Sequence, residues 1–413
     1  MNSRRNFLKG GTVGMFAGAF ASPALADPPA PPATPKPSAS ASDMGVVVSN
    51  QPGRGDFNTA DFDSDGQAIQ QAYDTMVTTL GLPKTLILDA SAGPLQMDRP
   101  LDIWQSHCRI TSTGGPTLVP ADAYKGPLIQ STLRKETQTG EDGCVTDVIM
   151  DNLWLNGRHR AIGIKLRNIQ LSTIHDIHVR NTDGPGLWLS EGCIENLFSD
   201  LILSDRCGNM DQPALLIETE AEQKPKGNDN ITVNSTHFSG VMIHFPDNQA
   251  LRIARGNADI QYSRRQRKIQ FTGCMFHGHD RATKPVVTLS DAYEINFVGT
   301  QMLRWSDKGA VIQIGEKGSR WPVGITMISH CHILAQPRST ETVGIEVVNV
   351  EENAPSLALF GNCFGSTDAR LGHAVDWGPQ KNKLVAWAAN AVNVKGEPHI
   401  GVMPADADVS PFA

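Results

Sequence analysis

Three aspartates stand at the same distance before three apolar strands and are suited to acid–base chemistry. Each lies four residues before the first inward-facing residue of its strand, which gives the pairs Asp183 and Leu187, Asp211 and Leu215, and Asp247 and Leu251. If the strands stack as successive coils, the carboxylates form a row with neighbours about 4.8 Å apart. Carboxylates this close separate their pKa values and supply an acid and a base. We therefore predict Asp183 and Asp211 as an acid/base pair, with Asp247 as the third member of the row.

Two other interpretations of this row stay open. The same carboxylates are suited to a calcium ion, although the sequence predicts no required metal or cofactor. Aspartate is also a common turn residue that hydrogen-bonds its own backbone. As acid and base, neighbours at about 5 Å suit a retaining glycosidase, and alternate coils at about 9 Å suit an inverting one.

Outward positions around these aspartates favour binding of a charged sugar. Trp offers a face on which a sugar ring stacks, and Lys and Arg bind carboxylate or sulfate groups. The outward positions of the strand after the turn and the next ones along it include Lys165, Arg167, Trp188, Glu218 and Arg252. We predict these five residues as the substrate grip, with a solvated face of mixed charge as the alternative.

Two more polar residues flank the turn that carries Asp183. His178 and Arg180 are outward on the strand before it, and Trp154 stands one repeat before His178. In lyase or epimerase chemistry a cation neutralises the uronate carboxylate while a base takes the α-proton. We predict Arg180 as the charge stabiliser and His178 as a binding residue.

A repeated pair of short strands must position these residues. The first strand cores are Leu153-Trp154-Leu155, Ile177-His178-Val179, Leu201-Ile202-Leu203, Thr236-His237-Phe238, Cys274-Met275-Phe276, Thr300-Gln301-Met302 and Cys331-His332-Ile333. The second are Ile164-Lys165-Leu166, Leu187-Trp188-Leu189, Leu215-Leu216-Ile217, Leu251-Arg252-Ile253, Val287-Thr288-Leu289, Ile312-Gln313-Ile314 and Ile345-Glu346-Val347. Such self-similarity, with turn residues between short alternating strands, is typical of a solenoid. The prediction is an all-β fold, a single-stranded right-handed parallel β-helix.

The chain ends predict export and processing. Ser3-Arg4-Arg5-Asn6-Phe7-Leu8-Lys9, a weakly apolar stretch and Ala24-Leu25-Ala26 are typical of a twin-arginine signal peptide. We predict a signal over 1–26, a disordered Pro/Ala/Ser linker over 27–44, the β-helix over 45–395 and a tail over 396–413. The expected location is the periplasm or the medium, with the twin-arginine export machinery as a partner and no membrane span after signal removal.

Charge and cysteine content exclude other classes. The formal net charge is −7, and removal of Arg4, Arg5 and Lys9 leaves −10, which argues against nucleic-acid binding. The seven cysteines are an odd number without a Cys-x-x-Cys motif. Three of them, Cys274, Cys331 and Cys363, are expected in one column of small side chains with Thr236 and Thr300. Pairing of Cys331 with Cys363 stays open.

The opening of the domain resembles the pectate-lyase-like superfamily, in its rhamnogalacturonase and epimerase branch. The resemblance rests on the acidic turn and helix at Phe62-Asp63-Ser64-Asp65-Gly66-Gln67-Ala68-Ile69-Gln70-Gln71-Ala72 and on the coils that follow. Ala68, Ile69, Ala72, Tyr73, Met76, Val77 and Leu80 fall on one helix face, which is expected to close the end of the stack. Asn181-Thr182-Asp183-Gly184 matches one polygalacturonase motif, but the other two motifs of that group are absent.

The resemblance implies a polysaccharide substrate and a β-helix fold. We therefore predict an exported protein that cleaves an acidic polysaccharide by hydrolysis or β-elimination. The alternative is a non-catalytic glycan-binding or structural β-helix of the cell envelope, similar to a tailspike or adhesin. The absence of any complete catalytic motif favours that alternative.

Overall fold

A computed structural model describes most of the chain after residue 44. The described ranges are 45–79, 84–113, 118–132, 144–219, 232–254, 266–306, 308–316, 323–336, 341–348, 356–365, 371–376 and 383–392. All of them belong to one compact unit, residues 40–413. The predicted signal peptide, linker and C-terminal tail lie outside the described residues, and the domain limits stay predictions.

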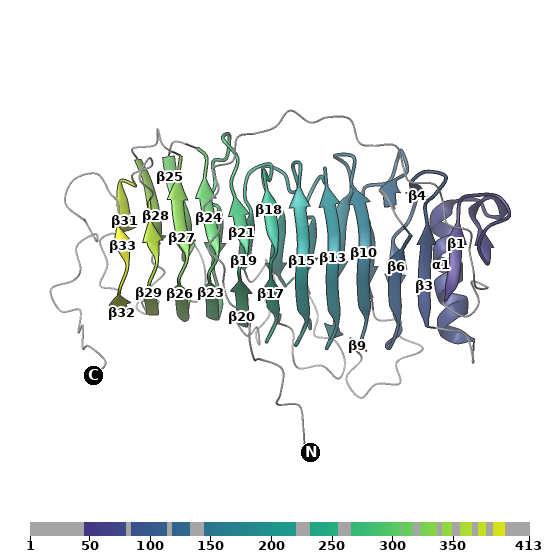
Figure 1. Ribbon diagram of the computed structural model, residues 1–413, viewed down its shortest axis with the longest axis horizontal. Coiled ribbons are helices and arrows are strands. Elements are labelled where there is room, and N and C mark those ends of the chain that lie inside the picture. The colour runs from purple at the N-terminus through teal and green to yellow at the C-terminus, as the bar shows by residue number, and fades with distance from the viewer. Residues whose placement is uncertain are drawn as a thin grey trace, which may run out of the picture. The chain divides into compact units, whose positions relative to one another are not determined.

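Parallel strands build the described part of the chain, stacked coil upon coil (Figure 1). One sheet holds β1 (Val46–Ser49), β2 (Phe57–Asn58), β3 (Thr85–Asp89), β4 (Leu95–Met97), β6 (Arg109–Ser112), β7 (Leu118–Pro120), β10 (Ile149–Asn156), β13 (Thr173–Arg180), β15 (Leu197–Ser204), β17 (His237–Ser239), β18 (Met242–His244), β20 (Gln266–Thr272), β21 (Met275–His277), β23 (Ala292–Val298), β24 (Gln301–Arg304), β26 (Ile325–Ser329), β27 (His332–Ala335), β29 (Ser356–Phe360), β30 (Cys363–Phe364), β32 (Lys383–Ala388) and β33 (Ala391–Val392).

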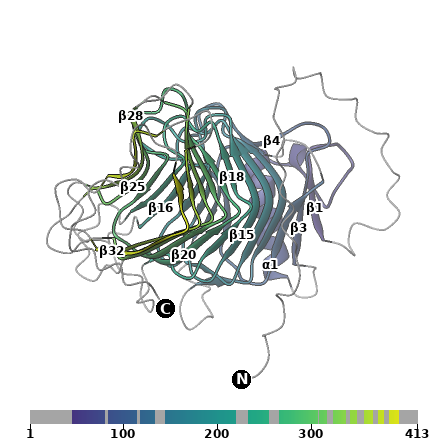
Figure 2. The same ribbon diagram turned by 60° about the vertical axis from the view of Figure 1, so that its left-hand side comes forward.

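A second sheet faces the first across the core. It holds β5 (Leu101–Ile103), β8 (Pro127–Ser131), β11 (Ile162–Leu166), β14 (Leu187–Leu189), β16 (Leu215–Glu218), β19 (Leu251–Ala254), β22 (Val287–Leu289), β25 (Lys308–Ile314), β28 (Glu341–Val347) and β31 (His373–Asp376). β9 (Val145–Thr146) and β12 (Ile169–Gln170) form a short further pair. Figure 2 is turned so that the stack of coils is seen obliquely from one end, and it shows the sheets enclosing one interior. The prediction of a parallel β-helix is confirmed.

The large sheet bends at one left-handed residue in each coil. In β13 the corner is Asp176, with φ 53°, which divides Thr173–His175 from Ile177–Arg180. The corner residues of successive coils are Asn152, Asp176, Asp200, Gly240, Gly273 and Gly299. Glycine, asparagine and aspartate adopt this conformation most readily, so the sequence specifies the corner locally.

Substitutions at Gly273 should show that this corner is a backbone requirement. A Cβ added there meets no atom within 4 Å, and φ is 61°. Gly273→Ala should therefore cost about 1–2 kcal/mol through backbone strain alone. Gly273→Asn should cost clearly less, since Asn152 occupies the same corner four coils away. Urea unfolding of both variants measures the difference, and equal costs would contradict this explanation.

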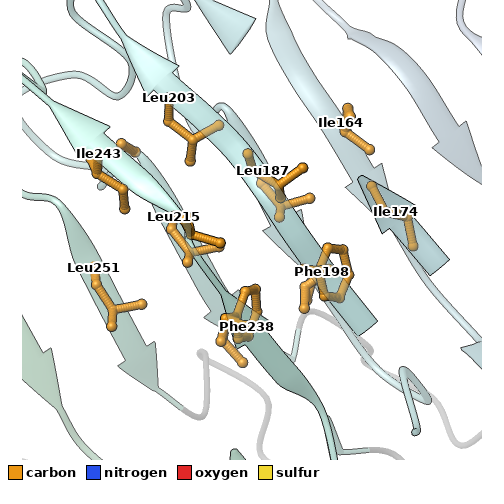
Figure 3. Close-up of a cluster of buried hydrophobic side chains, with 14 of the residues drawn as sticks. Ile164, Ile174, Leu187, Phe198, Leu203, Leu215, Phe238, Ile243 and Leu251 are labelled. Carbon is orange, nitrogen blue, oxygen red and sulfur yellow. The ribbon is translucent and has the colours of Figure 1, made fainter. Parts of the chain in front are cut away.

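The core is one apolar column inside the coils (Figure 3). Phe198, Phe238, Phe271 and Phe297 stack in it, with ring centroids 4.9, 4.8 and 5.0 Å apart from one coil to the next. Offset stacking adds to the burial of apolar surface that stabilises the fold. A stack this regular keeps successive coils in register.

All seven predicted second-strand cores are in register, but one first-strand core was wrong. Leu203 pairs with Ile243, so Val241–Ile243 continues the first-strand series, whereas His237–Ser239 pairs with Leu197–Ser199 on the other side of the corner. The bent sheet has two limbs, the strand segments before and after the corner, and apolar and polar residues alternate along both. The pattern was therefore assigned to the wrong limb. The same error displaced Thr236 from its predicted column.

The predicted cysteine column is correct only in part. Cys274, Thr300 and Cys331 follow one another in register, but Cys363 pairs with His332. All seven cysteines are free. Cys331 and Cys363 therefore do not form the disulfide that the sequence left open.

A short helix closes the first coils, as predicted. α1 (Asp65–Thr78) begins after Ser64, whose side chain accepts a hydrogen bond from the Gln67 amide. Its buried face comprises Gly66, Ala68, Ile69, Ala72, Tyr73 and Met76. The helix covers apolar side chains that the end of a solenoid would otherwise leave in water.

Candidate functional site

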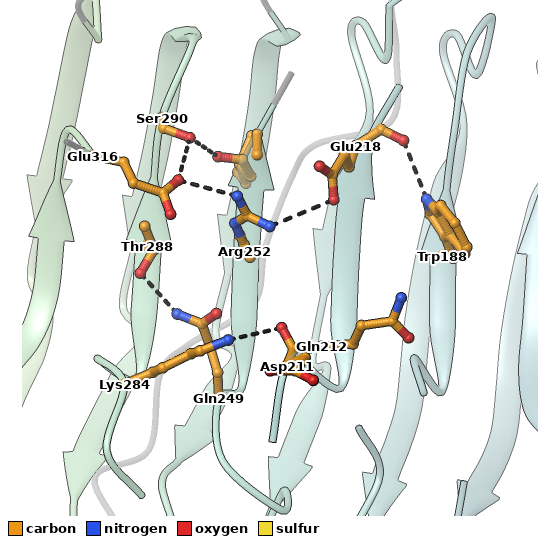
Figure 4. Close-up of polar contacts among 12 residues, drawn as sticks. Trp188, Asp211, Gln212, Glu218, Gln249, Arg252, Lys284, Thr288, Ser290 and Glu316 are labelled. Atoms are coloured by element: carbon orange, nitrogen blue, oxygen red, sulfur yellow. Dashed lines mark hydrogen bonds and ion pairs between the residues drawn. The ribbon is translucent and has the colours of Figure 1, made fainter. Parts of the chain in front are cut away.

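The outward side chains of the smaller sheet form a ladder of polar contacts (Figure 4). Lys165, Trp188, Leu216, Arg252 and Thr288 follow one another in register on β11, β14, β16, β19 and β22. Lys165 Nζ lies 4.0 Å from the centre of the Trp188 ring, and Trp188 Nε1 donates to the Glu218 carbonyl oxygen at 3.1 Å. Three of the predicted grip residues, Lys165, Trp188 and Arg252, thus lie in one row, and Arg167 and Glu218 lie two residues further along the chain from it. These residues already contact other groups of the protein.

Carboxylates of the protein neutralise the two arginines of this face. Arg252 forms ion pairs with Glu218 at 3.6 Å and with Glu316 at 3.1 Å. Arg167 pairs with Glu191, whose side chain is fully buried. Burial raises the pKa of Glu191, but hydrogen bonding from Ser190 and the nearby Arg167 outweigh it and leave the pKa below its usual value. A ligand carboxylate would have to displace these partners, so this row is less open to an anion than the sequence suggested.

The outward side of the large sheet carries another arginine, Arg180, close to a histidine and an aromatic ring. His178 pairs in register with Trp154, and their ring centroids are 5.4 Å apart in an edge-on arrangement. Arg180 lies two residues further along β13, on the same face. Trp154, Leu155, His178 and Arg180 line a shallow depression, in which Trp154 is 42% exposed.

Arg180 differs from the other arginines in this region. No hydrogen bond or ion pair of its guanidinium group occurs in the part of the chain that the structure describes. Its charge acts on His178, whose pKa is lowered by burial and by Arg180, while Asp205 opposes the shift. Arg180 is therefore a positive charge that an external anion can reach without breaking an ion pair.

His178 is held in place by the next coil. Its Nε2 atom lies 2.7 Å from Ser204 Oγ, on β15. With the pKa of His178 below its ordinary value of 6.5, the ring is neutral at pH 7. In the tautomer whose Nε2–H donates to Ser204, Nδ1 carries no proton and can accept one.

The turns that carry the three predicted aspartates differ in length. The turn after β15 spans 205–214, whereas those after β13 and β18 span only 181–186 and 245–250. Asp211 lies in the longest of these turns and is exposed. The Asp247 amide donates to the Cys207 carbonyl oxygen and the Gly208 amide to that of Gly184, so Cys207 follows the Asp183 position. The count back from the second strand missed this insertion.

Each aspartate has its own setting. Asp183 is exposed and accepts a hydrogen bond from Asn209 Nδ2 at 3.4 Å. The Asp211 amide donates to Asn209 Oδ1 at 2.9 Å and its carbonyl oxygen accepts from Lys284 at 2.7 Å. Asp247 is half-buried. The roles of all three in acid–base chemistry stay predictions, and within the described ranges no three His, Cys, Asp or Glu residues are arranged to hold a metal ion.

Asp205 was missed by the sequence interpretation. It follows Ser204 directly, is exposed, and acts electrostatically on both His178 and His244. Arg180, Ser204 and His244 occupy one column on three successive coils, so Asp205 lies at the centre of the charged region. Finding it from sequence would have required the register of β18, which the wrong limb assignment concealed.

Comparison with known proteins identifies the fold. No family model and no curated protein matches the chain. A surface adhesin of Streptococcus pneumoniae, PfbA, is similar with a TM-score of 0.56 and 10% identity, covering 84% of this chain and 85% of that one. An alginate lyase from Paenibacillus sp. has a TM-score of 0.52 and 12% identity, covering 76% of this chain and 97% of that one.

Phage proteins are also similar. The enzymatically active domain of bacteriophage CBA120 tailspike protein 2 has a TM-score of 0.54 and 11% identity, covering 78% of this chain and 45% of that one. Geobacillus virus E2 ORF18 has a TM-score of 0.52 and 15% identity over 78% of this chain, which spans 59% of that protein. At these identities the likeness shows a shared parallel β-helix fold. In addition, no described helix has the length and apolar character needed to cross a membrane.

Proposed function

We propose that the protein binds and cleaves an acidic polysaccharide by β-elimination at Arg180 and His178. The observation that supports this most is the guanidinium group of Arg180, which has no ion pair with any described residue, next to a neutral imidazole and an aromatic ring. The solved structures with this fold include an alginate lyase and an enzymatically active tailspike domain, which is compatible with such an activity. Export by the twin-arginine route to the periplasm or medium belongs to the same proposal, and fractionation of the host cells tests it.

The residues divide the chemistry between them. Arg180 binds the uronate carboxylate and stabilises the negative charge that develops when the neighbouring carbon loses its proton. His178, with Nε2–H donated to Ser204, takes that proton on Nδ1. The electron pair left on C5 forms the C4=C5 double bond, the C4–O bond breaks, and the departing oxygen takes a proton from water. Trp154 supports the sugar ring.

Two readouts on one panel of polysaccharides test this function. Polygalacturonate, alginate, hyaluronate, gellan and uncharged glucans are incubated with the mature protein. Elimination yields both new reducing ends and the ultraviolet absorbance of the conjugated double bond. Reducing ends without absorbance would show hydrolysis instead of elimination and would favour Asp183 and Asp211 as the acid and the base. Binding without either product would contradict both cleavage reactions and favour a glycan-binding protein without catalytic activity.

The titration of His178 provides a second test. Its pKa lies below 6.5 because of burial and Arg180, so the acid limb of kcat/KM should fall below pH 6.5. Removing the positive charge by Arg180→Gln should raise the pKa of His178, whereas Asp205→Asn should lower it. Titration of the His178 ring proton by NMR in the two variants measures both shifts. Shifts of the same sign would contradict the arrangement.

A further inference from the structure

A cluster of aromatic rings and imidazoles continues the Arg180 column on the following coils. This ring cluster comprises His244, Phe245, His277, His279 and Trp305. The Phe245 ring lies 4.0 Å from His244, 6.3 Å from His279 and 6.0 Å from Trp305 between centroids. His244 and His277 are 5.3 Å apart. The rings come from the ends of three neighbouring strands and the turns after them.

The ring cluster leaves polar atoms without partners. Both ring nitrogens of His277, Nε1 of Trp305 and Oγ of Ser306 are buried and make no hydrogen bond with any residue that the structure describes. Buried polar groups in folded proteins are nearly always hydrogen-bonded, and each exception is unfavourable for stability. Three such atoms in the ring cluster and a fourth on the adjacent Ser306 indicate a place where hydroxyl groups of a ligand supply the missing partners.

Phe245 covers this place in an unusual conformation. It is 38% exposed although it is a large apolar side chain, and its φ of 49° is a left-handed value that non-glycine residues seldom adopt. Its carbonyl oxygen accepts from the Arg206 amide at 3.0 Å, which helps to hold the strained backbone. The strain places an aromatic ring at the surface above His244, His279 and Trp305.

The ring cluster is suited to an uncharged group. Burial and the neighbouring His244 lower the pKa of His277 to about 4, and burial lowers that of His244, so both rings are neutral at pH 7. Among the residues that the structure describes, the one carboxylate that forms an ion pair with the ring cluster is Asp280, which lies 2.5 Å from His279 Nδ1. Aromatic faces and neutral donors and acceptors are the groups that bind sugar rings without carboxylates.

The ring cluster and Arg180 are close enough to hold one polysaccharide chain. Phe245 directly follows β18, two coils beyond Arg180 on β13, and Trp305 follows β24, four coils beyond it. At about 4.8 Å per coil these separations are about 10 and 19 Å along the stack. An oligosaccharide lying along the coils therefore meets a cationic position and then a neutral aromatic one.

We propose that the ring cluster is a subsite for an uncharged sugar residue of the substrate, which makes that substrate a heteropolysaccharide with uronates separated by neutral sugars. This inference rests on the proposed function of Arg180. It predicts a preference for gellan, in which uncharged sugars separate the uronates, over polygalacturonate, which consists of uronates.

Affinity electrophoresis through gels containing either polymer tests the proposal without requiring turnover. Phe245→Ala and Trp305→Phe should each weaken binding to gellan at least about tenfold, as expected from the loss of an aromatic stacking partner or a hydrogen-bonded N–H, and leave polygalacturonate binding unchanged. Leu171→Ala is the matched control, since Leu171 is also exposed at 53% with a left-handed φ of 51°. It should affect neither polymer.

His277→Phe separates binding from folding. Removing two unpartnered nitrogens should raise the melting temperature, whereas binding to gellan should fall. Equal effects of the ring variants on both polymers, or no effect on either, would overturn the subsite. If polygalacturonate binds in an Arg180-dependent way without any preference for gellan, only this inference fails. If neither polymer binds, the proposed function fails with it.

Discussion

Replacing Arg180 by glutamine is expected to lower kcat/KM on an acidic polysaccharide by about 10²–10³-fold, the loss typical of a group that stabilises transition-state charge. Arg180 is the cation beside His178, and no carboxylate among the described residues neutralises it. Glutamine keeps a polar side chain of similar length and removes the charge. Initial rates of double-bond formation measure the effect.

Two matched variants make this result specific. Lys268→Gln removes an exposed positive charge on the other limb of the bent sheet and should change the rate little. Arg252→Gln removes a cation already paired with Glu218 and Glu316, and it should reduce stability more than turnover. If Arg252→Gln abolished turnover while Arg180→Gln retained it, the active surface would lie on the smaller sheet instead.

Replacing Arg304 by methionine is expected to cost about 3–5 kcal/mol of stability, as the loss of a buried charged partner does. Arg304 is only 2% exposed, and burial lowers its pKa to about 10, so it stays protonated at neutral pH. Its guanidinium group donates to four carbonyl oxygens, those of Ala282, Lys284, Lys308 and Ala310, at distances of 2.6–3.3 Å. Methionine fills much of the space but leaves these carbonyls without a donor.

Urea unfolding measures this cost. Arg281→Met is the control, because Arg281 lies in the turn that carries the acceptors Ala282 and Lys284 and is exposed. This variant should unfold at the same urea concentration as the wild type. An unchanged midpoint for Arg304→Met would show that water replaces the guanidinium group at these carbonyls.

The repeat pattern predicted the fold because each coil repeats the same local requirements. The second strands are short and bounded by turns, so Leu187, Leu215 and Leu251 aligned correctly without further information. The first strands are the two limbs of a bent sheet with the same alternation. Only the left-handed corner at Gly240 distinguishes Phe238 from Ile243. A pattern of apolar residues cannot make that distinction alone.

The candidate site was harder to predict because it depends on turn lengths and on pairing between charges. Asp211 was placed beside Asp183 by a count that did not allow for the longer turn at 205–214. Arg167, Arg180 and Arg252 are indistinguishable in the sequence. Only the structure shows that Arg167 forms an ion pair with Glu191, and that Arg252 forms ion pairs with Glu218 and Glu316. The ring cluster remained unseen because Phe245 and Trp305 are far apart in sequence and carry no motif.

The most direct test of the central proposal is a crystal structure of the His178→Asn variant with a bound uronate-containing oligosaccharide. We expect a uronate carboxylate within hydrogen-bonding distance of the Arg180 guanidinium group, and the sugar ring against Trp154. The carbon that loses its proton should face position 178. An oligosaccharide bound instead along Lys165, Trp188 and Arg252, with Arg180 open to solvent, would contradict the proposal.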